Sequence, residues 1–302
     1  MKVAINYSHA AADLFESGHI PVDVFKCPAW PELVTEARER HAAYIHFPLG
    51  TTRDLDNVID SERKAPADLD HVARLLDASD TPYVNVHFAP TLHTYPDLPV
   101  DTTDTAHTEH IIADAVRSIR ALQQYFGRDR IIMENVPDAG NTVMRPAILP
   151  ETINRVVEQT GCGFLLDISH AAIAADFLGM DTHTYLEALP VQHIAEIHIT
   201  GVHLIDETHI ARLNAMGVEE SMYHRLIGRL VDHLPFTERD WDLLEWVMSR
   251  IGSGEWRAPW VVSFEYGGVG GIWEMIGDRD VMAEQVPRLH SIVHSTRPTI
   301  AD

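Results

Sequence analysis

Short apolar runs recur along the chain, separated by longer segments in which apolar residues have helical spacing. The runs are rich in Val, Ile, Phe and Tyr and are bounded by Pro, Gly and Asp, which is typical of buried β-strands. This pattern predicts strands at residues 2–8, 22–27, 42–48, 83–90, 130–137, 163–170, 195–201 and 260–268.

The intervening segments favour helices, most clearly at residues 30–40, 69–78, 107–126, 150–160 and 237–251. Within 110–125 the apolar positions fall at i, i+3 and i+4 spacing, as on the buried side of a helix. Thr237 and Asp240 have the spacing of a capping box that opens the helix at 237–251.

Eight strands alternating with about eight helices predict an α/β protein that folds as one (β/α)₈ TIM barrel over residues 1–302. An open doubly wound sheet is disfavoured, because no GxGxxG loop follows the first strand. The connections at 88–106 and 202–236 are long, and 217–231 predicts an extra helix. Both connections follow strands, so we expect them on the face where such barrels hold their active sites.

Side-chain alternation along the strands places one polar residue near the end of each strand from the third to the eighth. The neighbouring position is apolar in every case, at Ile45, Val86, Met133, Leu166, Ile197 and Phe264. Because alternate residues of a strand point to opposite faces, the polar residues should point into the barrel. They are His46, His87, Glu134, Asp167, His198 and Glu265.

Three carboxylates and three imidazoles in one place are costly unless a cation neutralises them. A lone histidine at a strand end is usually structural, but this repeated set predicts a centre for Mn, Fe, Zn or Co. His170 lies three residues beyond Asp167 and can reach the same point from the loop. Asp232 and His233 precede the helix at 237–251 and are further candidate ligands.

The formal net charge of −22 disfavours nucleic acids and anionic membranes as partners. The isolated cysteines Cys27 and Cys162 predict a reducing compartment, and we find neither a signal peptide nor a membrane span, so we expect a cytoplasmic protein. Lys26, at the end of the second strand, and Asn85, beside His87, are candidate substrate contacts.

The motifs "MENVP", "LLDISHA", "EIHITG" and "VSFEYGG" resemble the metal-binding strands of the xylose-isomerase-like TIM-barrel superfamily. That superfamily includes sugar isomerases and epimerases, endonuclease IV-type enzymes, and multi-iron oxygenases of the methanobactin-biosynthesis type. The resemblance implies that one metal is held by Glu134, Asp167, His198 and Glu265, with His170 contacting the substrate or a second metal.

The endonuclease-like and multi-iron branches add histidines on the third and fourth strands, which His46 and His87 match. They also carry a D-x-H in the late loop. This chain departs from that motif, because Asp232 and His233 are adjacent and Val231 stands where the aspartate is expected. The resemblance thus implies one to three metal ions, with two sites matched better than three.

The first function that the resemblance implies is a sugar or sugar-phosphate isomerase or epimerase. There the metal assists proton transfer, and Glu134 and Glu265 act as acid and base. The alternatives are a multinuclear iron oxygenase acting on a peptide, an endonuclease IV-like phosphoesterase and, less favoured, a non-enzymatic metal-binding barrel. The acidic charge disfavours DNA and suits a small-molecule substrate, which we favour over a peptide.

Overall fold

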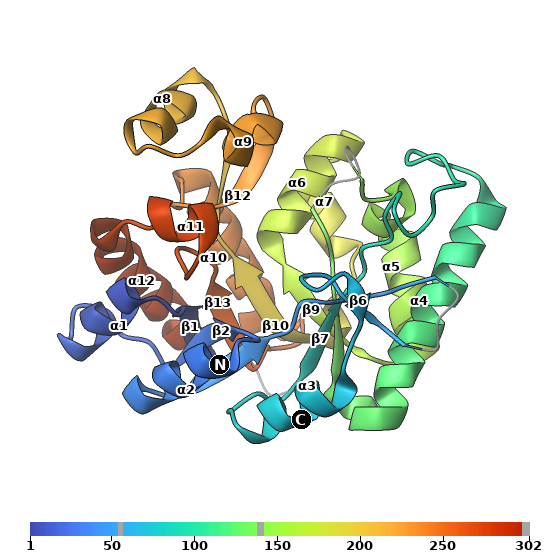
Figure 1. The fold of residues 1–302 in the computed structure, drawn as a ribbon, viewed down its shortest axis with the longest axis horizontal. Helices are drawn as coiled ribbons and strands as arrows, with labels where there is room; N and C mark the ends of the chain where they lie inside the picture. Colours follow the sequence, from blue (N-terminus) through green and yellow to red (C-terminus); the bar gives the residue numbers. More distant parts are fainter. Residues whose placement is uncertain (54–56, 138–141, 298–302) are drawn as a thin grey trace.

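Parallel strands surround the centre of the molecule in the computed structural model, which describes residues 1–53, 57–137 and 142–297 (Figure 1). Their order is β3-β2-β1-β13-β10-β9-β8-β7, which is chain order around a ring and confirms the predicted TIM barrel. The strands are β1 (Lys2–Asn6), β2 (Val24–Pro28), β3 (Ala43–His46), β7 (Val84–His87), β8 (Ile131–Glu134), β9 (Gly163–Asp167), β10 (Ile194–Ile199) and β13 (Val261–Phe264).

The ring has a seam between β3 and β7, which share no strand pairing in the described residues. After β3 and two connecting residues the chain forms β4 (Leu49–Gly50), which pairs with β7 on one side and with β5 (Ile59–Asp60) on the other. β6 (Ala65–Pro66) pairs with β5 at the edge of the sheet. Side chains close the remaining gap. The Phe47 NH donates to Asn85 Oδ1 at 2.7 Å, the Asn85 amide donates to the Phe47 carbonyl at 3.0 Å, and the Ile45 NH donates to Thr81 Oγ1 at 2.8 Å.

Helices cover the outside of the ring, and the five predicted most clearly from the sequence are present. They are α1 (His9–Glu16), α2 (Pro31–Arg40), α3 (Leu69–Asp77), α4 (Thr105–Phe126), α5 (Pro150–Thr160), α6 (Ile168–Leu178), α7 (Thr182–Glu187), α10 (Glu238–Gly252), α11 (Gly271–Ile276) and α12 (Arg279–Ser295). The capping box at Thr237 and Asp240 is confirmed at the start of α10. None of the helices in the described ranges combines the length and hydropathy that a bilayer crossing requires.

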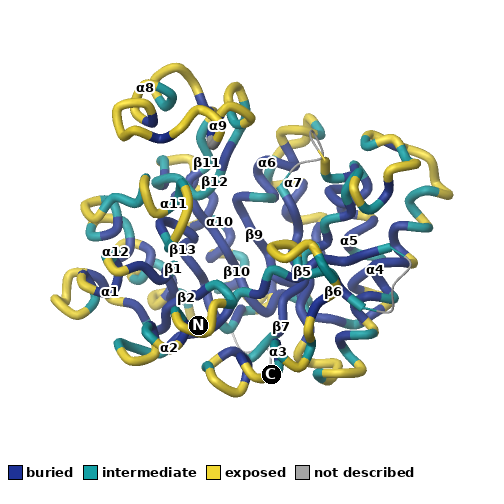
Figure 2. The backbone as a smooth tube through the Cα atoms, in the orientation of Figure 1, coloured by how far each residue is buried: buried dark blue, intermediate teal, exposed yellow. Residues whose placement is uncertain are grey.

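The predicted inward and outward faces of the strands are also observed. The outward residues Val86, Met133 and Leu166 are fully buried in the main core beneath the helices. Inside the ring, smaller apolar clusters such as Ile132, Leu165 and Ala195 fill the space below the polar strand ends. Figure 2 shows buried strands in the middle and exposed outer surfaces on the helices.

The long connection after β10 forms a projecting segment, residues 201–234, which we call the arm (Figure 1). It contains β11 (Gly201–Leu204), α8 (Glu207–Ala215), α9 (Glu220–Tyr223) and β12 (Leu230–Leu234), with β11 and β12 antiparallel. The predicted helix over 217–231 is therefore present only in part, as α9 and the 3₁₀ turn His224–Leu226 that follows it. Gly217 and Gly228 adopt positive φ angles of 75° and 74°, a left-handed conformation that interrupts a helix, and a strand occupies the end of the range.

Candidate metal centre

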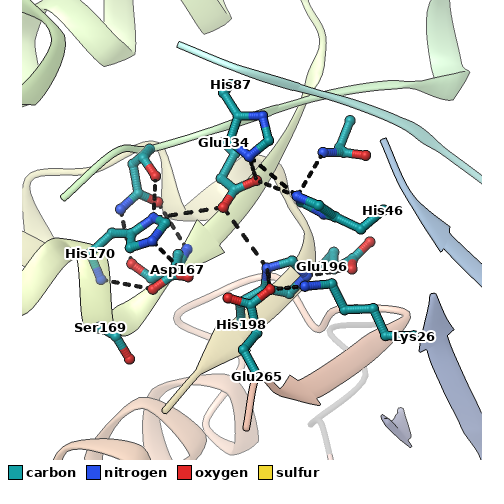
Figure 3. A network of polar contacts seen from close by, with 12 residues as sticks. Lys26, His46, His87, Glu134, Asp167, Ser169, His170, Glu196, His198 and Glu265 are labelled. Carbon is teal, nitrogen blue, oxygen red and sulfur yellow. Dashed lines mark hydrogen bonds and ion pairs between the residues drawn. The ribbon is translucent and has the colours of Figure 1, made fainter. Parts of the chain in front are cut away.

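The six polar strand-end residues predicted to point inward meet at the C-terminal end of the barrel (Figure 3). Among the described residues, three groups there bring ligand atoms within 4.8 Å of one another. The groups are His46, Glu134 and His198; Glu134, Asp167 and His170; and Asp167, His198 and Glu265. The groups share members, so the arrangement is one connected centre rather than separate sites.

Glu134 lies in the middle of this centre, and its two oxygens face different partners. Oε2 is 3.2 Å from His87 Nε2 and 3.5 Å from His46 Nε2. Oε1 is 3.6 Å from His170 Nδ1 and 3.9 Å from His198 Nδ1. A carboxylate placed this way is suited to join two cations.

Asp232 and His233, on β12 of the arm, reach the same centre. Asp232 Oδ2 is 3.0 Å from His170 Nε2 and 3.7 Å from His233 Nε2. Adjacent strand residues normally point to opposite faces, but His233 has a φ of 59°. This left-handed backbone turns its ring back toward Asp232, so both side chains of the shortened motif face the centre.

Hydrogen bonds on the outer side orient the histidine rings. Nδ1 donates to a backbone carbonyl in three of them, His87 to Leu49 at 2.9 Å, His170 to Asn135 at 2.8 Å and His233 to Glu265 at 2.8 Å. In a neutral ring this leaves Nε2 unprotonated, which is the form that binds a metal.

His198 is oriented in the opposite way, through a carboxylate. Its Nε2 is 2.7 Å from Glu196 Oε1, which also accepts a 2.8 Å hydrogen bond from the Tyr44 hydroxyl. His198 Nδ1 therefore faces the centre, 2.9 Å from Glu265 Oε1. Glu196 and Tyr44 were not predicted as site residues, although each shares an inward strand face with a predicted ligand, Glu196 with His198 and Tyr44 with His46.

The donor set fits a metal ion. Glu134 Oε2 and His198 Nδ1 are buried and have no hydrogen-bond partner among the described residues. Burial raises the pKa of Asp167 to about 7, and burial followed by the Lys26 ammonium lowers the pKa of His46 and His198 well below the usual value. Carboxylates that resist ionisation beside neutral imidazoles gain most from a cation.

Lys26 provides a buried positive charge at the edge of the centre. The residue is 6% exposed, and its ammonium forms an ion pair with Glu265 Oε1. Burial lowers the pKa of Lys26 to about 8. Asn85, the other predicted substrate contact, has its amide bonded to the backbone of Phe47 and lies 3.2 Å from His46 Nε2. For both residues the substrate role stays a prediction.

A cavity of about 350 Å³ opens above the centre. His46, His87, Glu134, His170, His233, Glu265 and Lys26 line it, together with Trp273 and the 267–269 loop. Trp273 packs against the His233 ring, with centroids 4.9 Å apart. The arm histidines His203 and His209 lie outside this cavity; His203 contacts the Pro235 carbonyl and His209 contacts Asp206.

A family of known proteins matches the part of the chain that carries most of this centre. The family model of the RiPP precursor modification enzymes MbnB/TglH/ChrH, which act on ribosomally synthesised and post-translationally modified peptides, matches residues 45–250. The chain belongs to this family. The resemblance to the xylose-isomerase-like TIM-barrel superfamily is thereby confirmed.

Curated relatives of this family member carry the name UPF0276 protein. One from Caulobacter vibrioides (strain NA1000 / CB15N) is 31% identical over 192 residues, and one from Caulobacter sp. (strain K31) is 33% identical over 187 residues. These alignments cover 59% and 58% of this chain. The chain spans 65% of the length of each relative, slightly under two thirds.

Among solved structures, D-psicose 3-epimerase from Clostridium cellulolyticum H10 is similar, with a TM-score of 0.50 and 13% sequence identity. The superposition covers 99% of this chain and 100% of the epimerase chain. At this identity the match supports the TIM-barrel fold.

Proposed function

We propose that this protein is a multinuclear iron oxygenase that modifies a ribosomally made precursor peptide. The observation that carries the proposal is the position of Glu134, whose two oxygens face separate groups of histidines. A single-metal site needs no such bridge and leaves His46 and His87 without a role. The family match supports the peptide as the class of substrate.

The residues divide among the proposed ions as follows. His46, His87 and Glu134 would hold the first, and Glu134, Asp167, His198 and Glu265 would hold the second. His170, Asp232 and His233 would complete the second ion or hold a third. Imidazole and carboxylate ligands suit ferrous and ferric iron, which would supply dioxygen activation when bound.

The chain's own groups around the cavity would select and position the peptide. A space of about 350 Å³ admits one or two side chains rather than a folded domain. Lys26 would place its ammonium against an anionic group of the substrate once a metal competes for Glu265. Trp273 would cover the apolar side of the entering residue and exclude water.

Metal content tests this proposal. We expect protein purified without chelator, or reconstituted with ferrous iron under argon, to hold at least two iron ions per chain. The Glu134→Gln variant should bind more than one ion fewer than the wild type, because the substitution removes the negative charge that faces both groups of ligands. Mössbauer spectra should show magnetically coupled iron in the wild type. One ion per chain, or uncoupled iron at full occupancy, would contradict a multinuclear centre.

The isomerase or epimerase reaction predicted from the sequence is the second candidate. It is supported by Glu134 and Glu265, which both line the cavity and have the residue type needed for proton transfer. Proton exchange separates the two candidates. An epimerase loaded with Mn²⁺ or Co²⁺ should incorporate solvent deuterium into a ketohexose such as D-fructose without oxygen, whereas the oxygenase should consume dioxygen only with peptide present.

A further inference from the structure

A second cluster of metal-ligating side chains lies at the opposite end of the barrel from the proposed iron centre. Asp23 immediately precedes β2, and His290 and His294 are one turn apart on α12, the last helix. One ligand atom from each residue lies within 4.8 Å of the other two. Helix α12 packs against β1 and α1, so the cluster joins the final helix to the first strands (Figure 1).

Asp23 is held firmly in place by the first strand. Its carboxylate Oδ2 accepts a 2.7 Å hydrogen bond from the Val3 NH, and its own NH donates to the Val3 carbonyl at 2.9 Å. Burial opposes the charged form, but the Val3 NH and His294 hold the pKa of Asp23 below its usual value. The carboxylate is therefore an anion at neutral pH.

The two histidines face this anion together. His294 Nε2 lies 2.9 Å from Asp23 Oδ2, and the His290 and His294 rings are 4.0 Å apart at an interplanar angle of 32°. Burial, then the neighbouring His294, lowers the pKa of His290. Its imidazole is thus neutral and able to bind a metal at pH 7.

We infer that Asp23, His290 and His294 form a second site for a divalent transition metal such as Zn²⁺. Histidines at i and i+4 on one helical face form a recurrent zinc-binding pair, and a carboxylate completes a three-ligand set with a position for water. Ligand atoms around a tetrahedral zinc are about 3.3 Å apart. The 2.9 Å His294–Asp23 contact is close to that value, and the His290 ligand atom lies within 4.8 Å of both.

This site is independent of the proposed iron centre and would act on the fold. Asp23 precedes β2 and Lys26 lies in the middle of that strand, roughly 10 Å away along it. The two sites therefore share no ligand. A metal here would tie α12 to the edge of β1 and β2, and it would stabilise the closure of the barrel by its last helix.

Zinc titration of the protein with its active-centre metals in place tests the inference. We expect calorimetry to detect one additional Zn²⁺ per chain in the wild type, and at least tenfold weaker binding in His290→Gln and His294→Gln. Zinc should raise the melting temperature of the wild type by a few degrees and leave that of the two variants unchanged. His224→Gln is the matched control, because His224 is an exposed histidine one turn from Glu220; it should bind zinc as the wild type does.

Two results would overturn the inference. The first is equal zinc binding by the wild type and both glutamine variants. The second is a crystal of the wild type, soaked in zinc, whose anomalous map lacks a peak between Asp23, His290 and His294. The second measurement uses the unaltered chain, so it decides the question even if a variant folds poorly.

Discussion

At the scale of single residues, the centre depends on groups that hold its ligands as much as on the ligands themselves. His198 faces the centre with Nδ1 because Glu196, which also accepts a hydrogen bond from the Tyr44 hydroxyl, engages its other nitrogen. Partners of this kind fix the tautomer of a metal-binding histidine and raise its basicity.

We therefore expect Glu196→Gln to weaken metal binding by roughly 10- to 100-fold, because the amide cannot supply the negative charge that supports His198. Competition with a chelator of known affinity measures the change. Tyr44→Phe removes only one hydrogen bond to Glu196 and should have a smaller effect. Unchanged affinity in Glu196→Gln would show that Glu196 does not support the ligand.

His170 gives the metal-free protein a pH dependence. Burial opposes its charged form, but Asp167, Asp232 and Glu134 together raise its pKa to about 10. A histidine whose pKa is raised on folding gives stability that is complete below about pH 6.5 and is lost as the pH rises through 10. We expect urea titrations of metal-free protein to show the free energy of unfolding falling by at least about 1 kcal/mol per pH unit from pH 6.5 to 8, because Asp167, whose pKa burial raises to about 7, adds to the fall.

The window ends at pH 8 because burial lowers the pKa of Lys26 to about 8, and its deprotonation in the folded state acts in the opposite direction. His170→Gln should flatten the slope within the window. A slope as steep in that variant as in the wild type would assign the effect to other groups.

At the scale of elements, the arm matters because its β12 strand carries Asp232 and His233 into the centre. Its base is tightly packed at Gly201, where an added Cβ would collide with the backbone carbonyl of Pro235. The hairpin thus requires glycine there for space.

Gly201→Ala should destabilise the protein by about 1–3 kcal/mol and displace β12, so that fewer metal ions bind per chain. Thermal unfolding and metal analysis of the same samples measure both effects. Gly217→Ala is the control, since Gly217 has a φ of 75° but no atom near the added Cβ. It should cost only about 1 kcal/mol and leave metal content unchanged. Equal metal content in the wild type, Gly201→Ala and Gly217→Ala would show that the position of the arm does not affect metal binding at the centre.

The elements also show which parts of the structure could be predicted from the sequence. Alternation of side chains along six strands predicted that the six inward residues from His46 to Glu265 form one group. This prediction succeeds because side chains alternate between the two faces of a strand in any fold. The helix predicted over 217–231 is present only in part, because the helical pattern competes with left-handed glycines and with a hairpin partner far along the chain. The Lys26–Glu265 pair depends on contact between β2 and the end of β13, which lie on either side of β1 but far apart in the chain, so no local pattern contains it.

At the scale of the whole molecule, a net charge of −22 surrounds a centre that is itself rich in carboxylates. Cations, both metal ions and basic segments of a peptide, are the partners that this field attracts. Bound metal should accordingly be a large part of the stability of the fold.

We expect removal of metal by a chelator to lower the melting temperature by roughly 7 °C, as loss of a ligand held at about 1,000 times its Kd would do. Differential scanning calorimetry before and after reconstitution measures the shift. Glu134→Gln should gain much less from added metal, whereas Glu220→Gln, on the exposed surface of the arm, should respond as the wild type does. If the metal-free wild type were as stable as the metal-loaded protein, bound metal would not contribute to the stability of the fold.

At the seam, β3 and β7 have no backbone ladder of their own within the described ranges and are joined by side chains and by the short strand β4. His46 ends β3, His87 ends β7, and the two rings lie 3.2 Å apart at Nε2. An ion bound by both histidines would link β3 to β7. Release of that ion would therefore accompany local opening of the barrel at the seam. We expect this ion to exchange with solvent fastest, and the amides of Ile45 and Phe47 to exchange with deuterium more slowly once it is bound.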